Sequence, residues 1–383
     1  MRVGSLAKQF TAAAILLLEE DGALTTDDPL ARFLPSFPRG DEITLHLLLA
    51  HQAGVTRDVF ADWEARREPR SLDELVQEIA VRSLDFEPGS QTSYSNAGYT
   101  LLARVIEVAG GLPFADFMDS RVFGPLEMTR SGVWQVDEIV PGMAAGYDPG
   151  PSPAWLVNTP HEDPSNIYGA GGVYSTVGDL HIWSDALDSD ALLSASSREK
   201  MLTPYGAGRG YGIAVGAHAG AKRVGHDGVT HGFIAFLDRD LSDDLTIAYT
   251  GNIRSGVLGP VRTAIGAIAR GEHWEPIHPP SPPAEDREAA GPSRTELDRH
   301  VGTYELFPGF QVVISRVGED LYLLGTGGYP TILVPMGEDT FFYRARYETI
   351  RFEDEGGRTT GLIWIDRAGQ TYPATRLDDE PTP

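Results

Sequence analysis

A proline-rich segment divides this chain of 383 residues into two unequal parts. Six prolines lie within the seventeen residues 276–292. Proline fixes φ and lacks a backbone N–H, so such a segment forms neither a helix interior nor a central strand. We therefore predict a first domain at residues 1–272, a linker at 273–293 and a second domain at 294–383.

The first part is predicted to be a mixed α+β domain. Residues 6–20 (LAKQFTAAAILLLEE) are strong helix formers that stop before an Asp-Gly pair, and further helices are predicted at 99–108 and 177–187. Residues 233–237 and 245–250 alternate like strands on either side of a turn at 240–244, which predicts a hairpin.

The second part contains short alternating runs that are typical of β-strands, separated by glycine or acidic turns. These runs are QVVIS, DLYLLG, TILVPM, TFFYRA, TIRFED and GLIWID. They predict a small all-β domain, either an antiparallel barrel or a sandwich.

Charge and composition exclude several classes of function. The chain carries 31 Lys and Arg against 55 Asp and Glu, and this net charge of −24 disfavours nucleic acid and anionic membranes as partners. Its longest apolar run, residues 12–18, is far shorter than the roughly 20 residues of a membrane-spanning helix. There is no cysteine, and the histidines show no metal-ligand spacing, so we expect neither a metal nor a cofactor. A small molecule or a peptide remains as the substrate, and the oligomeric state is left open.

Ser5-Leu6-Ala7-Lys8 opens the helix predicted at 6–20. Residues three apart share a helix face, so the Lys8 amine can reach the Ser5 hydroxyl. Only three of the 31 basic residues are lysines, and a buried lysine can lose its proton whereas an arginine cannot. The helix N-terminus also favours negative charge on the serine oxygen. Ser5 is therefore a candidate nucleophile and Lys8 a candidate base.

The same pattern occurs a second time, at Ser197-Arg198-Glu199-Lys200. This copy lies in a polar stretch with no apolar helix behind it. We interpret Ser197 and Lys200 as a solvated coincidence.

Tyr94-Ser95-Asn96 follows a Pro-Gly turn at 88–89 and precedes the helix predicted at 99–108. We therefore expect Tyr94 and Asn96 on a loop that is anchored at both ends. A phenol can pass on a proton, and a carboxamide can bind a substrate carbonyl. Taken alone, the pattern also fits a half-buried tyrosine beside a helix cap.

His226-Asp227-Gly228-Val229 lies just before the predicted hairpin. We expect Gly228 to let a substrate backbone come close, and His226 to offer a donor or a titrating group at the same edge. His218-Ala219-Gly220 repeats the spacing, but we interpret His218 as part of a hairpin tip at 216–220. Asp179, at the start of the helix predicted at 177–187, is interpreted as a helix-terminus carboxylate rather than a catalytic one.

Ser-x-x-Lys, Tyr-x-Asn and His-x-Gly, in this order, resemble the motifs of the serine β-lactamase and penicillin-binding-protein superfamily. Segments 4–12, 47–54, 86–99, 124–128, 170–176 and 251–252 also look like family segments in family order. The resemblance implies an antiparallel sheet flanked by helices, together with an all-helical lobe. The second part resembles the lipocalin-like barrel that follows some peptidase members.

The resemblance also implies roles for the motif residues. Ser5 would be the nucleophile, Lys8 its base, and Tyr94 the group that passes the proton to the leaving group. Asn96 would hold the carbonyl side of the substrate, while the backbone N–H groups of Ser5 and Val229 would form the oxyanion hole.

Two departures from the family pattern affect these expectations. His226, which would contact substrate or Tyr94, replaces the lysine usual in β-lactamases and transpeptidases, and a neutral imidazole binds a carboxylate less well. His-x-Gly members resemble esterases and D-amino-acid peptidases instead. Only four residues precede Ser5, where the resemblance implies a helix and the first strands of the sheet. We expect either a truncated or misplaced start, which could have removed a signal peptide, or a sheet completed by the barrel or another chain.

The leading hypothesis is a serine hydrolase that forms an acyl-enzyme with an ester or amide, of the esterase or D-amino-acid-peptidase type. Within the enzymes, the alternative is a β-lactamase or DD-carboxypeptidase. The alternative that is not an enzyme is a non-catalytic binder that uses the same cleft. The presence of all three intact motifs disfavours this binder.

Overall fold

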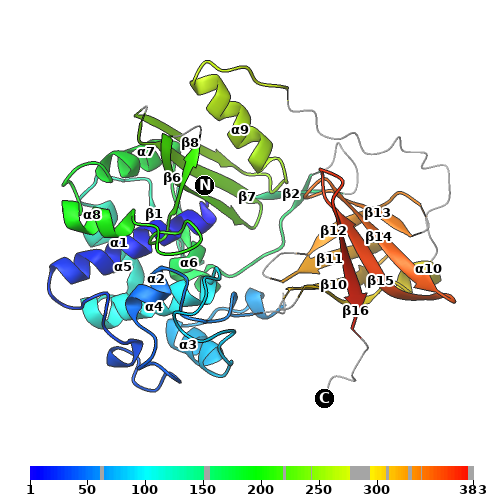
Figure 1. Cartoon of the computed structure of the whole chain (residues 1–383), viewed down its shortest axis with the longest axis horizontal. Coiled ribbons are helices and arrows are strands. Elements are labelled where there is room, and N and C mark those ends of the chain that lie inside the picture. Colours follow the sequence, from blue (N-terminus) through cyan, green and yellow to red (C-terminus); the bar gives the residue numbers. More distant parts are fainter. Residues whose placement is uncertain are drawn as a thin grey trace. The chain divides into compact units, whose positions relative to one another are not determined.

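The computed structural model describes residues 1–60, 64–150, 156–218, 221–242, 244–276, 294–307, 310–326, 330–337 and 339–377 (Figure 1). Contacts divide the chain into two units, Met1–Gly146 with Pro160–Asn252, and Tyr147–Thr159 with Ile253–Pro383. Most of the predicted linker, residues 277–293, lies outside the described residues. The limits 1–272, 273–293 and 294–383 remain our proposal for the domains. Within the described ranges, no helix combines the length and apolarity that crossing a membrane requires.

The first unit combines helices with one antiparallel sheet. Its α-helices are α1 (Ala7–Glu20), α2 (Leu45–Leu49), α3 (Leu72–Ala80), α4 (Asn96–Gly110), α5 (Phe114–Met118), α6 (Tyr168–Gly171), α7 (Val177–Ala186) and α8 (Ala195–Met201). Shorter helical turns are η1 (Gly4–Leu6), η2 (Leu30–Arg32), η3 (Glu64–Arg67), η4 (Asp119–Phe123) and η5 (Pro164–Asn166). The sheet has the order β5 (Ala214–His218), β6 (Ala221–Thr230), β7 (Phe233–Asp240) and β8 (Leu245–Gly251), and a small pair joins β1 (Gly132–Val133) to β4 (Val173–Tyr174). The helices predicted at 6–20, 99–108 and 177–187 and the predicted hairpin are confirmed.

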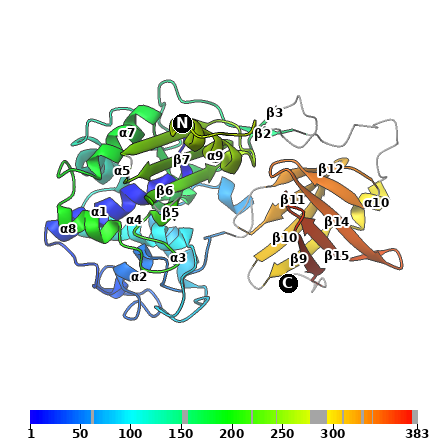
Figure 2. The same ribbon diagram turned by 45° about the horizontal axis from the view of Figure 1, so that its top comes forward.

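Helix α1 forms the centre of this unit. All its residues from Ala7 to Leu18 are buried, because most of them are apolar and lie all around the helix, which must therefore be enclosed. It lies between the sheet on one side and α2, α3 and α4 on the other (Figures 1 and 2). The polar residue Gln9 accepts a hydrogen bond from Trp183 Nε1 at 2.8 Å, and Thr11 Oγ1 donates to Gly169 O at 2.8 Å.

The first residues of the chain hold Ser5 against strand β6. The Met1 amine donates to Ser175 O at 2.7 Å, and Val3 N donates to Val173 O at 3.0 Å. A Cβ added to Gly228 would lie 1.9 Å from Val3 O. The Cβ side of Gly228 therefore faces the chain's own residues 3–5, and the approach of a substrate backbone to Gly228 stays a prediction.

Helix α4 begins at Asn96, three residues earlier than predicted. Ser95 is its N-cap, since its Oγ accepts a hydrogen bond from Gly98 N at 2.8 Å. Asn96 thus lies in the first turn of a helix, and its placement on a loop was wrong. Of the two motif residues expected on the loop, Tyr94 alone lies before the N-cap.

The interpretation of Ser197 as solvated is also wrong. Ser197 is 5% exposed on α8 and is hydrogen-bonded to Glu20, while Lys200 forms an ion pair with Glu19 at 2.8 Å. The second Ser-x-x-Lys pair therefore serves to attach α8 to the end of α1. Strand β5 continues to His218, which pairs with Ala221, and the residues between them lie outside the described ranges.

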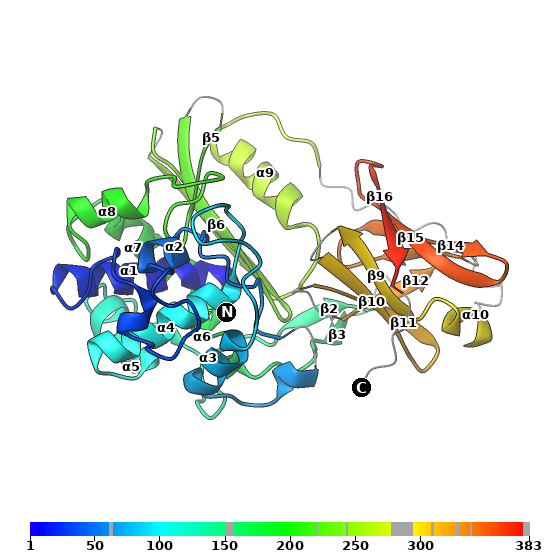
Figure 3. The ribbon, with the colours of Figure 1, turned by 60° about the horizontal axis from the view of Figure 1, so that its bottom comes forward.

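The second unit contains a closed eight-stranded antiparallel barrel, which decides between the predicted barrel and sandwich. Each strand pairs with the next, and the last pairs with the first. Figure 3 shows β9, β10 and β11 side by side. The strands are β9 (Gly302–Phe307), β10 (Phe310–Val317), β11 (Asp320–Gly325), β12 (Thr331–Pro335), β13 (Thr340–Tyr343), β14 (Glu348–Glu355), β15 (Arg358–Ile365) and β16 (Thr371–Arg376).

This unit also includes β2 (Tyr147–Pro149), β3 (Leu156–Asn158), α9 (Leu258–Ala269) and α10 (Arg294–Asp298). A buried ion pair of 2.7 Å joins Arg254 to Asp148 on β2, and Arg254 also donates to Thr331 Oγ1 on β12 at 3.1 Å. These contacts attach the β2–β3 hairpin to the barrel.

We predict that Gly228→Ala lowers the free energy of unfolding by about 1–3 kcal/mol, because residues 3–5 must move away from β6. Gly216→Ala, on β5 of the same sheet, is the matched control, since a Cβ there meets nothing within 4 Å. Chemical denaturation of both variants measures the difference. Equal stability of the two would contradict the contact between Gly228 and Val3.

Candidate active site

Ser5 and Lys8 meet at the start of α1. Ser5 is half-buried, whereas the Lys8 side chain is completely buried. Lys8 Nζ lies 3.3 Å from Ser5 Oγ, 2.7 Å from Asn96 Oδ1 and 2.7 Å from Ala170 O. Three elements of the fold thus converge on one amine.

Burial lowers the pKa of Lys8 well below its ordinary value, and the charges of Arg57 and Arg209 act in the same direction. The carboxylate charges of Asp58 and Asp227 oppose this effect on the Lys8 pKa. A neutral amine has two N–H donors and one lone pair. The two acceptors at 2.7 Å use the donors, which leaves the lone pair for the Ser5 hydroxyl. The arrangement can therefore take a proton from Ser5.

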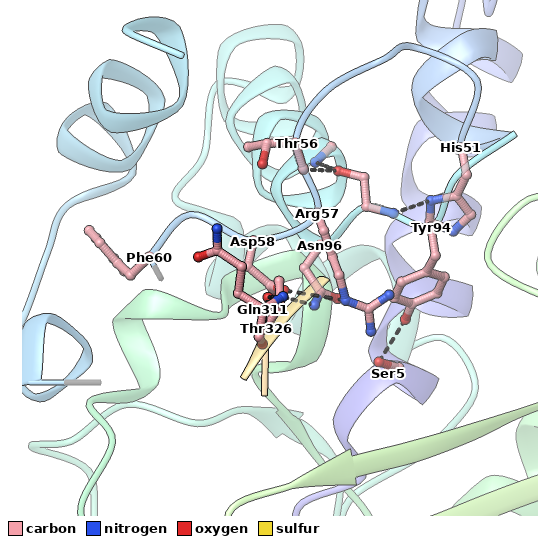
Figure 4. Close-up of polar contacts among 12 residues, drawn as sticks. Ser5, His51, Thr56, Arg57, Asp58, Phe60, Tyr94, Asn96, Gln311 and Thr326 are labelled. Atoms are coloured by element: carbon pink, nitrogen blue, oxygen red, sulfur yellow. Dashed lines mark hydrogen bonds and ion pairs between the residues drawn. The ribbon is translucent and has the colours of Figure 1, made fainter. Parts of the chain in front are cut away.

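The Tyr94 hydroxyl donates a hydrogen bond to Ser5 Oγ at 2.7 Å (Figure 4). Burial raises the pKa of Tyr94, so the residue is a phenol and not a phenolate at neutral pH. Ser5 is consequently bonded to two groups that can each exchange a proton with it.

The ring of His51 packs against the ring of Tyr94. The two rings lie 4.6 Å apart between centroids, and His51 Nδ1 accepts a hydrogen bond from Ser95 N at 3.1 Å (Figure 4). His51 is 3% exposed, and burial lowers its pKa well below the ordinary value, so the ring is an uncharged acceptor. The sequence placed His51 within a family-like segment, but nothing in the spacing indicated its contact with Tyr94.

Asn96 joins Lys8 to a carboxylate that the sequence analysis missed. Its Oδ1 accepts from Lys8, while its Nδ2 donates to Asp58 Oδ1 at 2.7 Å (Figure 4). Its second N–H has no partner among the described residues, and the substrate contact that the resemblance implies stays a prediction. No motif identified Asp58, because it lies in an irregular segment after α2.

His226 lies on β6 beside Tyr94, with 6.0 Å between ring centroids. It is 7% exposed, and its Nδ1 lies 2.5 Å from Asp227 O. Burial lowers the pKa of His226 to about 4. The imidazole is therefore uncharged at neutral pH.

The backbone of β6 approaches the Ser5 turn closely. A Cβ on Gly4 would lie 2.9 Å from Val229 N, and one on Gly228 would lie 3.2 Å from Ser5 N. The amides of Ser5 and Val229 thus belong to two backbone segments in contact with each other, as an oxyanion hole built from both would require.

The remaining candidates lie elsewhere. Asp179 accepts hydrogen bonds from Arg130 N at 2.9 Å and Ser131 Oγ at 2.7 Å, so it holds the start of α7 to the loop before β1. Over the ranges that the structure describes, no group of three or more His, Asp or Glu side chains is arranged to hold a metal ion.

We predict that the imidazole of His226 stays uncharged from pH 8 down to about pH 5 and titrates near pH 4, because burial disfavours the imidazolium. Proton NMR of the ring resonances measures this, with His226→Gln identifying the signal. A solvated histidine titrates near pH 6.5. A midpoint at or above that value would contradict the neutral state.

Comparisons with known proteins agree with this geometry. A family model described as Beta-lactamase matches residues 1–269. Penicillin-binding protein 4* of Bacillus subtilis (strain 168) is 30% identical over 375 residues, which cover 91% of this chain and 82% of that protein. A protein of the same strain, named penicillin-binding protein PbpX, is 32% identical over 267 residues. The match covers 69% of this chain and only 65% of the length of PbpX. A solved structure of a D-stereospecific amidohydrolase from Streptomyces sp. is 26% identical, with a TM-score of 0.59 over 66% of this chain and 82% of the other. The chain therefore belongs to the Beta-lactamase family.

Proposed function

We propose that this chain is a serine hydrolase that cleaves an ester or an amide through an acyl-enzyme on Ser5. The observation that carries the proposal is the hydrogen-bonded path from Tyr94 through Ser5 to a buried Lys8. An activated nucleophile needs a base within reach and a second group that orients it, and this path supplies both.

In the proposed reaction, Ser5 Oγ attacks the carbonyl carbon while Lys8 Nζ takes the hydroxyl proton. The negative charge that develops on the carbonyl oxygen is bound by the backbone N–H groups of Ser5 and Val229. Tyr94 passes a proton to the leaving group as the ester or amide bond breaks, and Lys8 returns the proton to Tyr94. Water then attacks the acyl-enzyme, and the same groups move its proton back to Ser5.

Asn96 and His51 act on this path without reacting. Asn96 fixes the position of the Lys8 amine through its Oδ1, and Asp58 fixes the orientation of the Asn96 amide. His51 holds the ring of Tyr94 and the backbone of Ser95. A displacement of about 1 Å in such groups can lower the rate by orders of magnitude.

The substrate is proposed to be an ester or a D-amino-acid amide. The name of the Streptomyces relative supports a D-configured amide as the substrate. The uncharged imidazole of His226, which stands where β-lactamases usually have a lysine, favours an esterase or D-amino-acid peptidase over a β-lactamase. A β-lactam or a DD-peptide is the second candidate, because the two Bacillus relatives are named as penicillin-binding proteins. A binder without chemistry would have no use for an amine buried against a serine.

We predict that a fluorophosphonate adds one adduct to the parent protein and none to Ser5→Ala, as measured by intact mass. Lys8→Arg should label at least about 100-fold more slowly, because arginine stays protonated and cannot act as the base. Ser197→Ala and Lys200→Arg carry the same changes in the second Ser-x-x-Lys pair and should label like the parent.

If the parent stays unmodified while circular dichroism shows it folded, the hydrolase proposal fails and the non-catalytic binder replaces it. An adduct that persists in Ser5→Ala would assign the nucleophile to another residue.

A further inference from the structure

We propose that Arg209 is a specificity-determining residue that binds a carboxylate of the substrate beside Tyr94. The inference rests on the proposed function, because it concerns which esters or amides the Ser5 site accepts. Its evidence is separate, and comes from a rigid turn and from the charges around Tyr94.

Arg209 closes a tight turn. Arg209 N donates to Gly206 O at 2.8 Å, and Tyr205 N donates to Arg209 O at 2.9 Å. The two central residues are left-handed, with φ of 47° at Ala207 and 68° at Gly208. Such a conformation is uncommon for alanine and persists only where the surroundings impose it. The turn therefore holds the Cα of Arg209 in a defined place.

The turn is anchored to the loops that carry the site. Gln52 Nε2 donates to Tyr205 O at 3.0 Å and to Thr92 Oγ1 at 3.3 Å. A Cβ on Gly206 would lie 2.5 Å from Thr92 Oγ1, so this glycine is needed for the close approach. Gln52 follows His51, and Thr92 precedes Tyr94 by two residues. Arg209 is thus built into the same support as Tyr94.

Two guanidinium groups lie near the ring of Tyr94. The Cζ atoms of Arg209 and Arg57 lie 5.0 Å and 5.3 Å from its centroid. Arg57 has a carboxylate partner, because its Nε lies 3.4 Å from Asp58 Oδ2. Across the described ranges, the half-buried guanidinium of Arg209 has no hydrogen-bond acceptor and no carboxylate within ion-pair distance.

The neighbouring acidic groups do not neutralise Arg209. Asp58 is engaged by Asn96 and Arg57, and Asp227 is exposed on β6. A half-buried guanidinium that has no anionic partner among the described residues gains most from an anion that arrives with the substrate. Its planar fork of N–H donors matches a carboxylate bidentately, which the uncharged His226 cannot do. The geometry therefore favours an ester or amide that carries a carboxylate close to the scissile bond.

The test uses two aryl esters that differ in one group, 3-acetoxybenzoate and 3-acetoxybenzamide. We expect the parent to prefer the carboxylate ester in kcat/KM. In Arg209→Gln this preference, the ratio of the two kcat/KM values, should fall at least about 10-fold, beyond any loss that both esters share when a positive charge near Lys8 is removed. Arg209→Lys should keep part of the preference, because it keeps the charge but loses the fork.

Arg130→Gln is the matched control, since Arg130 is exposed and its backbone bonds to Asp179 away from the site. A preference that is unchanged in Arg209→Gln would overturn the proposal. An equal loss for both esters would also overturn it, because Arg209 would then act on Tyr94 or on the fold.

Binding to Ser5→Ala separates this proposal from the hydrolase proposal. Calorimetric titration of Ser5→Ala with 3-acetoxybenzoate should show binding that the added Arg209→Gln change weakens at least about 10-fold. If the parent hydrolyses neither ester but this loss of binding is seen, the hydrolase proposal fails and the carboxylate site stands. Equal binding with and without Arg209 would refute the site even in an active enzyme.

Discussion

The burial of one amine is the constraint on which the rest of the site depends. Lys8 is enclosed in the centre of the first unit, on a helix whose other buried residues are mostly apolar. An ammonium ion without a carboxylate partner in such a place costs several kcal/mol, so the fold favours the neutral amine. The acceptors of Lys8 come from α4 and α6, and its lone pair faces the turn before α1. Packing of the core therefore sets the chemistry of Ser5.

Close backbone approaches make this convergence possible. Gly228 lets residues 3–5 lie on β6, and Gly169 lets α6 approach α4, since a Cβ on Gly169 would lie 2.8 Å from Tyr99 O. Around this frame, His51 packs against the ring of Tyr94, and Asp58 accepts a hydrogen bond from Asn96. His51 and Asp58 thus contribute to the site through their contacts with Tyr94 and Asn96.

The sequence predicted what local patterns encode. Helical spacing placed Ser5 beside Lys8, and alternation located six of the barrel strands. Strands β9 and β16 were not among the runs identified. Strand β16 carries Pro373 at its centre, and proline is unusual inside a strand. The start of α4 was set three residues too late, because the helix cap considered beside Tyr94 was not assigned to Ser95. Asp58 and Arg209 lie in irregular segments, so no periodic pattern indicated that Asp58 contacts Asn96 or that Arg209 lies near Tyr94. The role of Gly228 required knowing that the chain's own start returns to β6.

The central claim is that Lys8 is an uncharged amine at neutral pH. With only three lysines in the chain, selective 15N labelling of the lysine Nζ atoms gives a spectrum of three signals, and Lys8→Met assigns one of them. We expect the Lys8 signal in the amine range at pH 7.5 and a shift to the ammonium range on acidification, because burial disfavours the charge. An ammonium signal for Lys8 that persists to pH 9 would contradict the account.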